Sequence, residues 1–238
     1  NRYFFASGFI ENKVVLDVAC GTGYGSRYLA EGGAKKVVGG DISREAILYA
    51  VKMQDIENLS FVRLDATRLP FTSSSIDMIL SFETIEHLRR YKMFLAECKR
   101  TLKETGIFIC STPNKKISSP HTEKPLNPFH VKEFYPQELN RLLNNYFTNV
   151  ILYGQHFITL KTKIRSKVIG IGVKVLSIVP QGGQIKALLN KTLLPSSKKA
   201  KLETEISHNI MDNRYSVSPF KDNLFKTPSF IIAVAKKD

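Results

Sequence analysis

Short apolar runs alternate with amphipathic stretches through the first 155 residues of the chain. The run at 13–19 (KVVLDVA) is followed by glycines and is typical of a buried parallel strand. The next stretch, 24–31, is predicted to be a helix that ends at Gly32. Ser43 is predicted to cap a helix that continues to Gln54. The same patterns predict further strands at 35–40, 59–63, 76–81, 106–111 and 147–155, and further helices at 91–103 and 136–144.

This alternation predicts the α/β fold class, with a doubly wound, mainly parallel sheet and helices on both of its faces. A final strand at 229–236 (SFIIAVAK) comes about seventy residues after the strand at 147–155, which is too far for a plain loop in a compact domain. We therefore expect one domain built from residues 1–156 and 227–238. Residues 157–226 are expected to form an insertion or lid that is helical and basic.

A glycine-rich loop follows the first predicted strand, where the chain reads Asp17-Val-Ala-Cys-Gly21-Thr-Gly23-Tyr-Gly25. Ligands of doubly wound sheets bind outside the carboxyl ends of the strands. Gly21 and Gly23 allow the backbone to turn tightly and to approach such a ligand closely. Asp41 ends the second predicted strand, where its carboxylate can accept hydrogen bonds from both hydroxyls of a ribose. The loop and Asp41 together predict a cofactor site.

A glycine pattern of this kind also suits a dinucleotide, but two details favour a different cofactor. The dinucleotide fingerprint has its third glycine where this chain has Ser26. Asp17 stands just before the loop, where a carboxylate is unfavourable for a pyrophosphate but suits an ammonium group. The sequence therefore favours a cofactor that carries an ammonium group.

The segments VLDVACGTGYG, VVGGDIS, LDATRLPF and IDMILSFETIEHL follow one another along the chain. In order and spacing they resemble the motifs of class I S-adenosylmethionine-dependent methyltransferases, over about residues 3–155 and the last strand. The resemblance implies a Rossmann-like, seven-stranded sheet in the order 3-2-1-4-5-7-6, with the last strand antiparallel. It also implies S-adenosylmethionine as the cofactor and S-adenosylhomocysteine as the product.

The same resemblance implies a role for individual residues of the loops. Gly21 and Gly23 would hold the methionine part of the cofactor, with Asp17 near its ammonium group, and Asp41 would bind the ribose. The other implied contacts are Ile42 against the adenine, Asp65 and Ala66 at the adenine amino group, Ser81 and Phe82 over the sulfonium, and Tyr3 packed beside them. The alternative for each aspartate is a helix cap or a solvated loop residue.

Acidic and histidine residues follow the strand at 76–81. If Glu83 opens a helical turn, Glu86 and His87 lie on the same helical face, and His130 in the segment NPFHVKEF is a candidate fourth ligand. Such a set suits a divalent cation with open positions, which could deprotonate and orient a hydroxyl nucleophile. The alternative is an acidic helix start in which His87 caps the helix or acts alone. His87 or Glu83 is a candidate general base in either case.

Two further resemblances bear on the acceptor. The pattern Glu-x-x-Glu-His with a later His resembles metal-dependent small-RNA 3′-terminal 2′-O-methyltransferases, and its first three residues also resemble ubiquinone-biosynthesis O-methyltransferases. The segments STPN and NPFHVKEFYPQEL resemble bacterial glycan and small-molecule methyltransferases of the type 11 and type 23 kind. The chain has no Trp, so the Trp-containing stretch of the RNA enzymes is missing.

Nearly all of the excess positive charge lies in one segment. The net charge is +14, yet residues 1–138 carry 19 basic and 16 acidic side chains. Residues 139–202 carry 11 basic side chains and no Asp or Glu. The lysines and arginine of 161–201 stand among aliphatic residues, which predicts contact with an anionic membrane surface. Phosphates of RNA or of a diphosphate-linked lipid carrier are a second possibility.

RNA is the less favoured of these partners, because the basic segment lacks the interleaved aromatic residues of a stacking platform. A lid with a solvated basic face, packed on the core or on a second subunit of a homo-oligomer, is the other interpretation. Cys20, Cys98 and Cys110 are widely separated, which disfavours disulfides and a cysteine zinc site. This pattern is typical of a reduced, cytoplasmic protein, which could also lie peripherally at the membrane.

The sequence thus predicts an S-adenosylmethionine-dependent methyltransferase that acts on a hydroxyl of a sugar, a glycan precursor or another small molecule. RNA ribose 2′-O-methylation and non-catalytic binding of S-adenosylmethionine are the alternatives. The rim formed by Glu83, Glu86, His87 and His130 disfavours the non-catalytic alternative, because a protein that only binds the cofactor has no need of a base there.

Overall fold

The computed structural model describes residues 2–52, 55–159, 217–220 and 226–237. The chain divides into two compact units, of which the first contains Asn1–Gln155, Val217–Phe220 and Pro228–Asp238. The second contains His156–Ser216 and Lys221–Thr227, and nearly all of it lies outside the described residues. Most of the predicted helical lid, residues 157–226, and all of the predicted membrane contact through 161–201 also lie outside them. They stay predictions.

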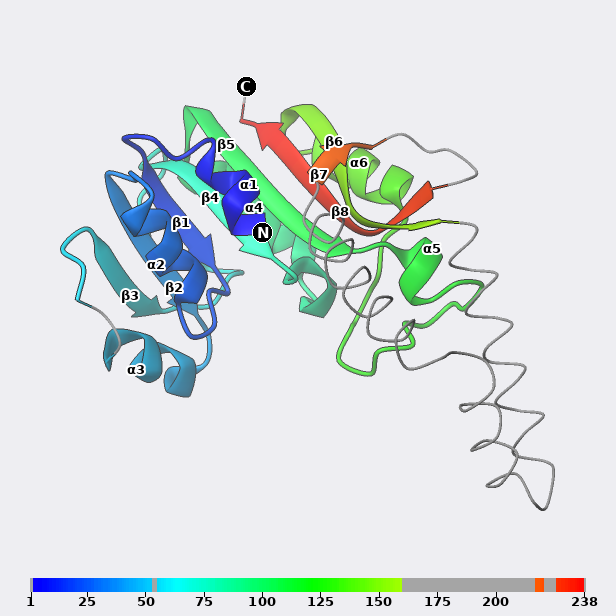
Figure 1. The fold of residues 1–238 in the computed structure, drawn as a ribbon, viewed down its shortest axis with the longest axis horizontal. Helices are drawn as coiled ribbons and strands as arrows, with labels where there is room; N and C mark the ends of the chain where they lie inside the picture. Colours follow the sequence, from blue (N-terminus) through cyan, green and yellow to red (C-terminus); the bar gives the residue numbers. More distant parts are fainter. Residues whose placement is uncertain (1, 53–54, 160–216, 221–225, 238) are drawn as a thin grey trace, which may run out of the picture. The chain divides into compact units, whose positions relative to one another are not determined.

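The first unit is built on one mixed sheet of eight strands in the order β3-β2-β1-β4-β5-β8-β6-β7, which Figure 1 shows from β3 at one edge to β7 at the other. Strands β1 to β5 pair in parallel, and β8 runs antiparallel to β5. The α/β class with a doubly wound arrangement is therefore confirmed. The strands are β1 (Val14–Val18), β2 (Lys36–Asp41), β3 (Leu59–Arg63), β4 (Ile76–Phe82), β5 (Leu102–Pro113), β6 (Thr148–Thr159), β7 (Val217–Pro219) and β8 (Lys226–Lys236).

The prediction of a seven-stranded sheet is wrong, because β7 adds an eighth strand beyond β6. Its three residues pair antiparallel with Tyr153, Gly154 and Gln155 of β6. A three-residue strand with a terminal proline has too few positions to show an alternating pattern. The sequence therefore placed it in the insertion instead of the sheet.

The helices are α1 (Arg2–Ser7), α2 (Tyr24–Glu31), α3 (Arg44–Lys52), the short 3₁₀ helix η1 (Ile85–His87), α4 (Tyr91–Thr101), α5 (Lys115–Ser118) and α6 (Pro136–Asn144). The predicted cap of α3 is confirmed, since the Ser43 hydroxyl accepts a hydrogen bond of 3.1 Å from the Ala46 amide. α4 ends before the predicted residue 103, because Leu102 is already extended and begins β5. No helix in the described part of the chain is long and apolar enough to cross a membrane.

Alternating strand residues build a core on each face of the sheet. Along β4, Met78 and Leu80 pack in one cluster and Ile79 packs in the other. Residues of α1 and α2 cover the first face, and residues of α4 and α6 cover the second; in Figure 1, α1 and α2 lie in front of the sheet. Both faces being covered explains why these strands read as nearly continuous apolar runs.

We expect Phe108→Ala to lower the free energy of unfolding by about 3–5 kcal/mol, the usual cost of truncating a buried phenylalanine. Phe108 is fully buried in the α4 and α6 face, and its ring stacks on Phe147 at a centroid distance of 4.9 Å. Urea unfolding measures the loss. The control is Phe4→Ala, because Phe4 is 68% exposed; its unfolding energy should change by less than about 0.5 kcal/mol. Equal losses in both variants would contradict the assigned core.

Candidate functional site

The loop between β1 and α2 has the backbone that the glycine pattern predicts. Gly21 and Gly23 have φ of 57° and 81°, in the left-handed region that glycine tolerates best. A Cβ at Gly21 would meet no atom within 4 Å, so the space above this residue is open. β1 pairs in parallel with β4, with Asp17 opposite Leu80. The glycine loop therefore borders the residues that follow β4.

Asp17 is fully buried beside this loop. Its carboxylate accepts hydrogen bonds from the Ser26 hydroxyl at 2.7 Å and from the Tyr3 hydroxyl at 3.1 and 3.2 Å. Burial raises the pKa of Asp17 to about 7, and the two hydroxyls only partly oppose this rise. Asp17 thus holds a proton at mildly acidic pH unless a cation reaches it.

Tyr3 covers Asp17 from α1. Its ring makes edge-to-face contacts with Phe82 and Tyr24, at centroid distances of 5.0 and 5.5 Å. A Cβ at Gly25 would overlap the Tyr3 ring, so Gly25 leaves the room that the ring needs. The structure therefore brings together Tyr3, Asp17 and Phe82, which the sequence resemblance placed around the methionine and sulfonium part of one cofactor.

Asp41 lies at the end of β2 and contacts the glycine loop directly. One carboxylate oxygen accepts a hydrogen bond from the Gly21 amide at 2.9 Å, and the other accepts one from the Ser43 amide at 2.9 Å. The side chain of Ile42 beside it is 64% exposed. Asp41 thus lies at the loop, as the spacing predicted. Each of its carboxylate oxygens accepts one hydrogen bond from a backbone amide of the neighbouring loops.

The remaining predicted cofactor residues lie at neighbouring strand ends. Asp65 and Ala66 follow β3, and the Asp65 carboxylate accepts hydrogen bonds of 2.8 Å from the amide and the hydroxyl of Thr67. These hydrogen bonds lower the pKa of Asp65. Ser81, at the end of β4, is buried, and its hydroxyl has no hydrogen-bond partner among the described residues.

Glu83 does not open a helical turn, so this premise of the metal prediction is wrong. Its φ of 53° is left-handed, and η1 begins only at Ile85. Its carboxylate accepts a hydrogen bond of 2.8 Å from the Ser111 hydroxyl and forms an ion pair of 3.3 Å with Arg2. Burial raises the pKa of Glu83, and the positive charge of Arg2 opposes that rise.

Glu86 is fully buried. Its Oε2 accepts a hydrogen bond of 2.9 Å from the Thr112 hydroxyl, whereas Oε1 has no partner among the described residues. Burial is the main cause that raises the pKa of Glu86 to about 8, and the nearby charge of Glu83 adds to it. The buried Glu86 and the partly exposed Glu83 together give this rim an acidic character.

The two predicted histidines meet at Glu86. The Nδ1 of His87 lies 2.9 Å from the Phe129 carbonyl oxygen, which can only accept, so Nδ1 carries the hydrogen. The rings of His87 and His130 are 4.8 Å apart in an edge-to-face arrangement. Ligand atoms of Glu86, His87 and His130 all lie within 4.8 Å of one another, and Glu83 is not part of this group. The structure thus brings together three of the four predicted metal ligands.

Glu133, which the sequence analysis did not single out, orients His130. It is buried, and its carboxylate accepts hydrogen bonds of 2.6 Å from His130 Nδ1 and 2.6 Å from the Ser118 hydroxyl. Burial acts to raise the pKa of Glu133, but these hydrogen bonds outweigh it and the pKa is lowered. The i,i+3 spacing of His130 and Glu133 was the one signal for this pair in the sequence.

Backbone hydrogen bonds fix the His130 segment to the turn after β4. The amides of Val131 and Lys132 both donate to the Glu86 carbonyl, at 2.7 and 3.1 Å. Arg2 is the other residue that sequence reasoning missed, because a single arginine near the start of the chain carries no pattern. The hydrogen bonds to the Glu86 carbonyl and the ion pair between Arg2 and Glu83 each join parts of the chain that only the folded sheet brings together.

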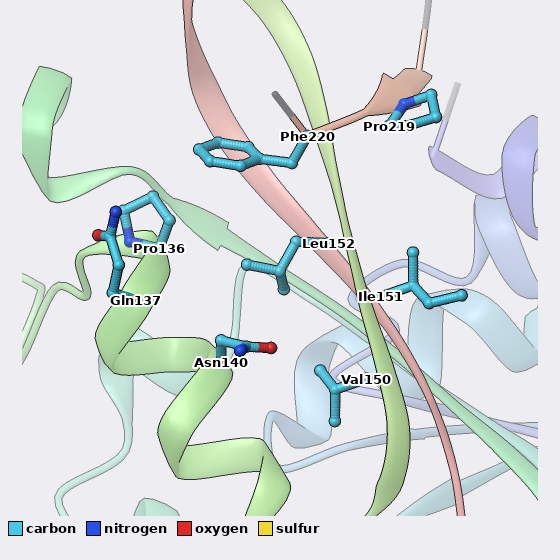
Figure 2. Close-up of a pocket in the computed structure, with 8 residues that line it drawn as sticks. All are labelled: Pro136, Gln137, Asn140, Val150, Ile151, Leu152, Pro219 and Phe220. Carbon is cyan, nitrogen blue, oxygen red and sulfur yellow. The ribbon is translucent and has the colours of Figure 1, made fainter. Parts of the chain in front are cut away.

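A separate pocket lies between α6 and the outer strands β6 and β7. It has a volume of about 440 Å³, and Figure 2 shows its lining of Pro136, Gln137, Asn140, Val150, Ile151, Leu152, Pro219 and Phe220. None of the predicted cofactor or rim residues is in this lining. The pocket is therefore distinct from the candidate site.

The chain is similar in sequence to known methyltransferases. Residues 16–110 match the family described as "Methyltransferase domain". A probable S-adenosylmethionine-dependent methyltransferase of Mycolicibacterium smegmatis is 36% identical over 129 residues, which is 54% of this chain and 49% of that protein. A fatty-acid O-methyltransferase of the same organism is 32% identical over 51% of this chain and 44% of its own length. This chain thus aligns with about half the length of these relatives.

The fold also matches solved structures. A SAM-dependent methyltransferase from Archaeoglobus fulgidus superimposes with a TM-score of 0.61, covering 99% of this chain and 90% of that one, at 18% sequence identity. At this level of identity the match concerns the fold alone.

We expect the pH dependence of stability to report on Asp17. The folded protein keeps the Asp17 proton up to about pH 7, whereas the unfolded chain releases it near 3.8. The Asp17 contribution to the free energy of unfolding therefore falls as pH rises through this window. The Asp17→Asn variant lacks this fall, so relative to the native protein it should gain about 2–3 kcal/mol between pH 5 and pH 8.

Urea unfolding of both proteins at the two pH values measures this difference. Asp55→Asn is the matched control, because Asp55 is exposed and its replacement should give no comparable change with pH. A pH-independent difference between Asp17→Asn and the native protein would show that Asp17 is ionised throughout.

Proposed function

We propose that the chain is a class I S-adenosylmethionine-dependent methyltransferase, which transfers the methyl group of S-adenosylmethionine to a hydroxyl oxygen. The acceptor is a sugar, a glycan precursor or another small hydroxyl compound. In the reaction the bond between carbon and the sulfonium sulfur breaks, and a bond between carbon and oxygen forms. The hydroxyl loses its proton, and S-adenosylhomocysteine leaves as the product.

The residues around the glycine loop fit this cofactor. The open space above Gly21 leaves room for a ligand, and Asp41 lies next to it. In our proposal Asp41 binds the ribose, and Asp17 binds the ammonium group of the methionine part in place of the Tyr3 hydroxyl. Asp17 gains from this exchange, because a buried carboxylate is stabilised by a close positive charge.

The observation that carries the proposal is the set of acidic and imidazole groups next to the glycine loop. Glu86, His87 and His130 gather in and beside the turn that follows β4, and β4 pairs directly with β1. A protein that only stores the cofactor has no use for such a set. A hydroxyl acceptor does need it, because proton removal makes the oxygen a better nucleophile. Positioning of acceptor and methyl group supplies much of the remaining acceleration.

A matched relative supports an oxygen acceptor. The protein from Mycolicibacterium smegmatis that aligns at 32% identity is named a fatty-acid O-methyltransferase. This name favours oxygen over nitrogen or carbon as the atom methylated, and it does not fix the acceptor molecule. The rim residues are compatible with a sugar hydroxyl as well as with other hydroxyl compounds.

We expect two single substitutions to separate cofactor binding from catalysis. His87→Asn should lower kcat by about a hundredfold or more with little change in the Kd for S-adenosylmethionine. Asp41→Ala should raise that Kd by roughly 10- to 100-fold, the usual effect of losing hydrogen bonds to a charged group. Calorimetric titration gives the Kd, and turnover assays give kcat. If Asp41→Ala binds the cofactor normally, the ribose assignment is wrong; Asp55→Ala is the control for loss of an exposed charge.

Transfer of labelled methyl groups to fractionated cell extract identifies the acceptor class. We expect label from S-adenosylmethionine in the polar-glycan or lipid fraction, and none when the His87→Asn variant replaces the native protein. Label confined to the RNA fraction would replace this proposal by RNA ribose methylation. No label in any fraction, with cofactor binding demonstrated, would favour a non-catalytic protein.

A further inference from the structure

We propose that Glu86, His87 and His130 form a binding site for one divalent first-row transition-metal ion, such as Mn²⁺, Fe²⁺, Co²⁺ or Zn²⁺. The site would have two imidazole ligands and one carboxylate ligand. The existence of the site is independent of the proposed methyl transfer, and its role in activating the acceptor rests on that function. Two imidazoles favour these ions over Mg²⁺ and Ca²⁺, which prefer oxygen ligands.

The first support is the convergence of three donor groups of the right kinds. One donor atom from each residue lies within 4.8 Å of the others. Donors that share one ion at about 2.1 Å each cannot be more than about 4.2 Å apart. The largest separation therefore needs to shorten by about half an ångström or more. His87 is exposed, so its ring can make this adjustment without disturbing the core.

The second support is an unpartnered buried carboxylate oxygen. Glu86 is fully buried, and its Oε1 accepts no hydrogen bond from any described residue, although Oε2 accepts one from Thr112. Buried polar atoms without a partner are rare in folded proteins, because each costs about 1–3 kcal/mol. A cation at this position would supply the missing partner. The same cation would also balance the charge of Glu86, because the nearby Arg2 is already paired with Glu83.

The third support comes from the hydrogen-bond partners of the three candidate ligands. A histidine that binds a metal through one ring nitrogen usually donates the other N–H to a carbonyl or a carboxylate. His87 donates from Nδ1 to the Phe129 carbonyl, and His130 donates from Nδ1 to the Glu133 carboxylate. Both histidines therefore have Nε2 as the nitrogen with a lone pair. Glu86 is held by a hydrogen bond that its Oε2 accepts from the Thr112 hydroxyl.

Asn127 occupies the lone pair of His130 in this structure. Its side-chain oxygen accepts from the Phe129 amide, so its amide nitrogen is the atom that lies 2.9 Å from His130 Nε2. Binding of an ion requires this N–H to withdraw. Asn127 is exposed, so water can satisfy the amide after it has moved away. Ion binding would thus exchange one solvent-accessible hydrogen bond for a coordination bond.

Three protein ligands leave further coordination positions open to water or to substrate. A hydroxyl acceptor bound at such a position would lose its proton to solvent more readily, because the ion stabilises the alkoxide. The alkoxide would then attack the methyl carbon of the sulfonium. The ion changes neither its charge nor its oxidation state in this step, so no oxidant or reductant is needed.

The test is direct metal binding to the purified full chain, measured without any acceptor. Calorimetric titration with Zn²⁺ and the visible absorption of bound Co²⁺ should both show one ion per chain. His87→Asn and Glu86→Gln should each weaken binding at least tenfold, and Glu133→Gln should weaken it by roughly 10- to 100-fold through His130. Since Glu86 and Glu133 are buried, thermal unfolding without metal checks that these two variants fold, and His87→Asn keeps the test valid if they do not.

Two matched variants serve as controls. Glu83→Gln should leave the affinity within about twofold, because Glu83 is held by Arg2 and Ser111 outside the group. His121→Asn removes an exposed histidine outside the group and should have no effect. The inference is overturned if Zn²⁺ and Co²⁺ fail to bind, or if His87→Asn binds them as well as the native protein does. Methyl transfer that persists in a metal-free chain overturns the catalytic role alone. A chain that binds metal but transfers no methyl group keeps the site and loses the proposed function.

Discussion

The parallel register between β1 and β4 is the constraint on which both parts of the candidate site depend. It places Asp17 opposite Leu80, so the glycine loop and the turn after β4 leave the same edge of the sheet. Helix α1 then contacts both, since Tyr3 donates to Asp17 and the next residue back, Arg2, pairs with Glu83. A shift of one residue in this register would turn Asp17 to the opposite face of the sheet, and α1 would lose its contact with that side chain.

Burial of carboxylates is the main energetic cost at this edge. Asp17 and Glu86 are fully buried, and burial is the largest cause of the raised pKa of each. The protein offsets the cost differently at each residue: two hydroxyls contact Asp17, a guanidinium contacts Glu83, and one hydroxyl contacts Glu86. A buried carboxylate is stable only when it is protonated or paired with a cation, so these side chains favour the binding of cationic ligands. The sulfonium and ammonium groups of the proposed cofactor are cations of this kind.

The sequence predicted the elements that repeat a pattern over many residues, and it missed those that depend on a single backbone angle or a distant partner. The strands at β1 to β5, the helices α2 and α6 and the Ser43 cap follow from apolar periodicity and local hydrogen bonding. Strand β7 has only three residues, so it carried no periodic signal. Glu133 reaches His130 across one turn of chain, and its importance follows only from the burial that the fold provides. The glycine loop was predictable because its backbone needs positive φ angles, and glycine is the residue that tolerates them best.

Glu83 shows why spacing alone could not define the rim. The i, i+3 and i+4 spacing of Glu83, Glu86 and His87 places them together only on a continuous helix. The left-handed backbone at Glu83 breaks that continuity, and the Glu83 amide bonds to the Ser111 carbonyl of β5 instead of joining η1. One backbone angle therefore separates two similar carboxylates into different environments. Glu83 is neutralised by Arg2 from α1, whereas Glu86 keeps an oxygen without a partner among the described residues and faces the two histidines. The chemistry available at this rim follows from that separation.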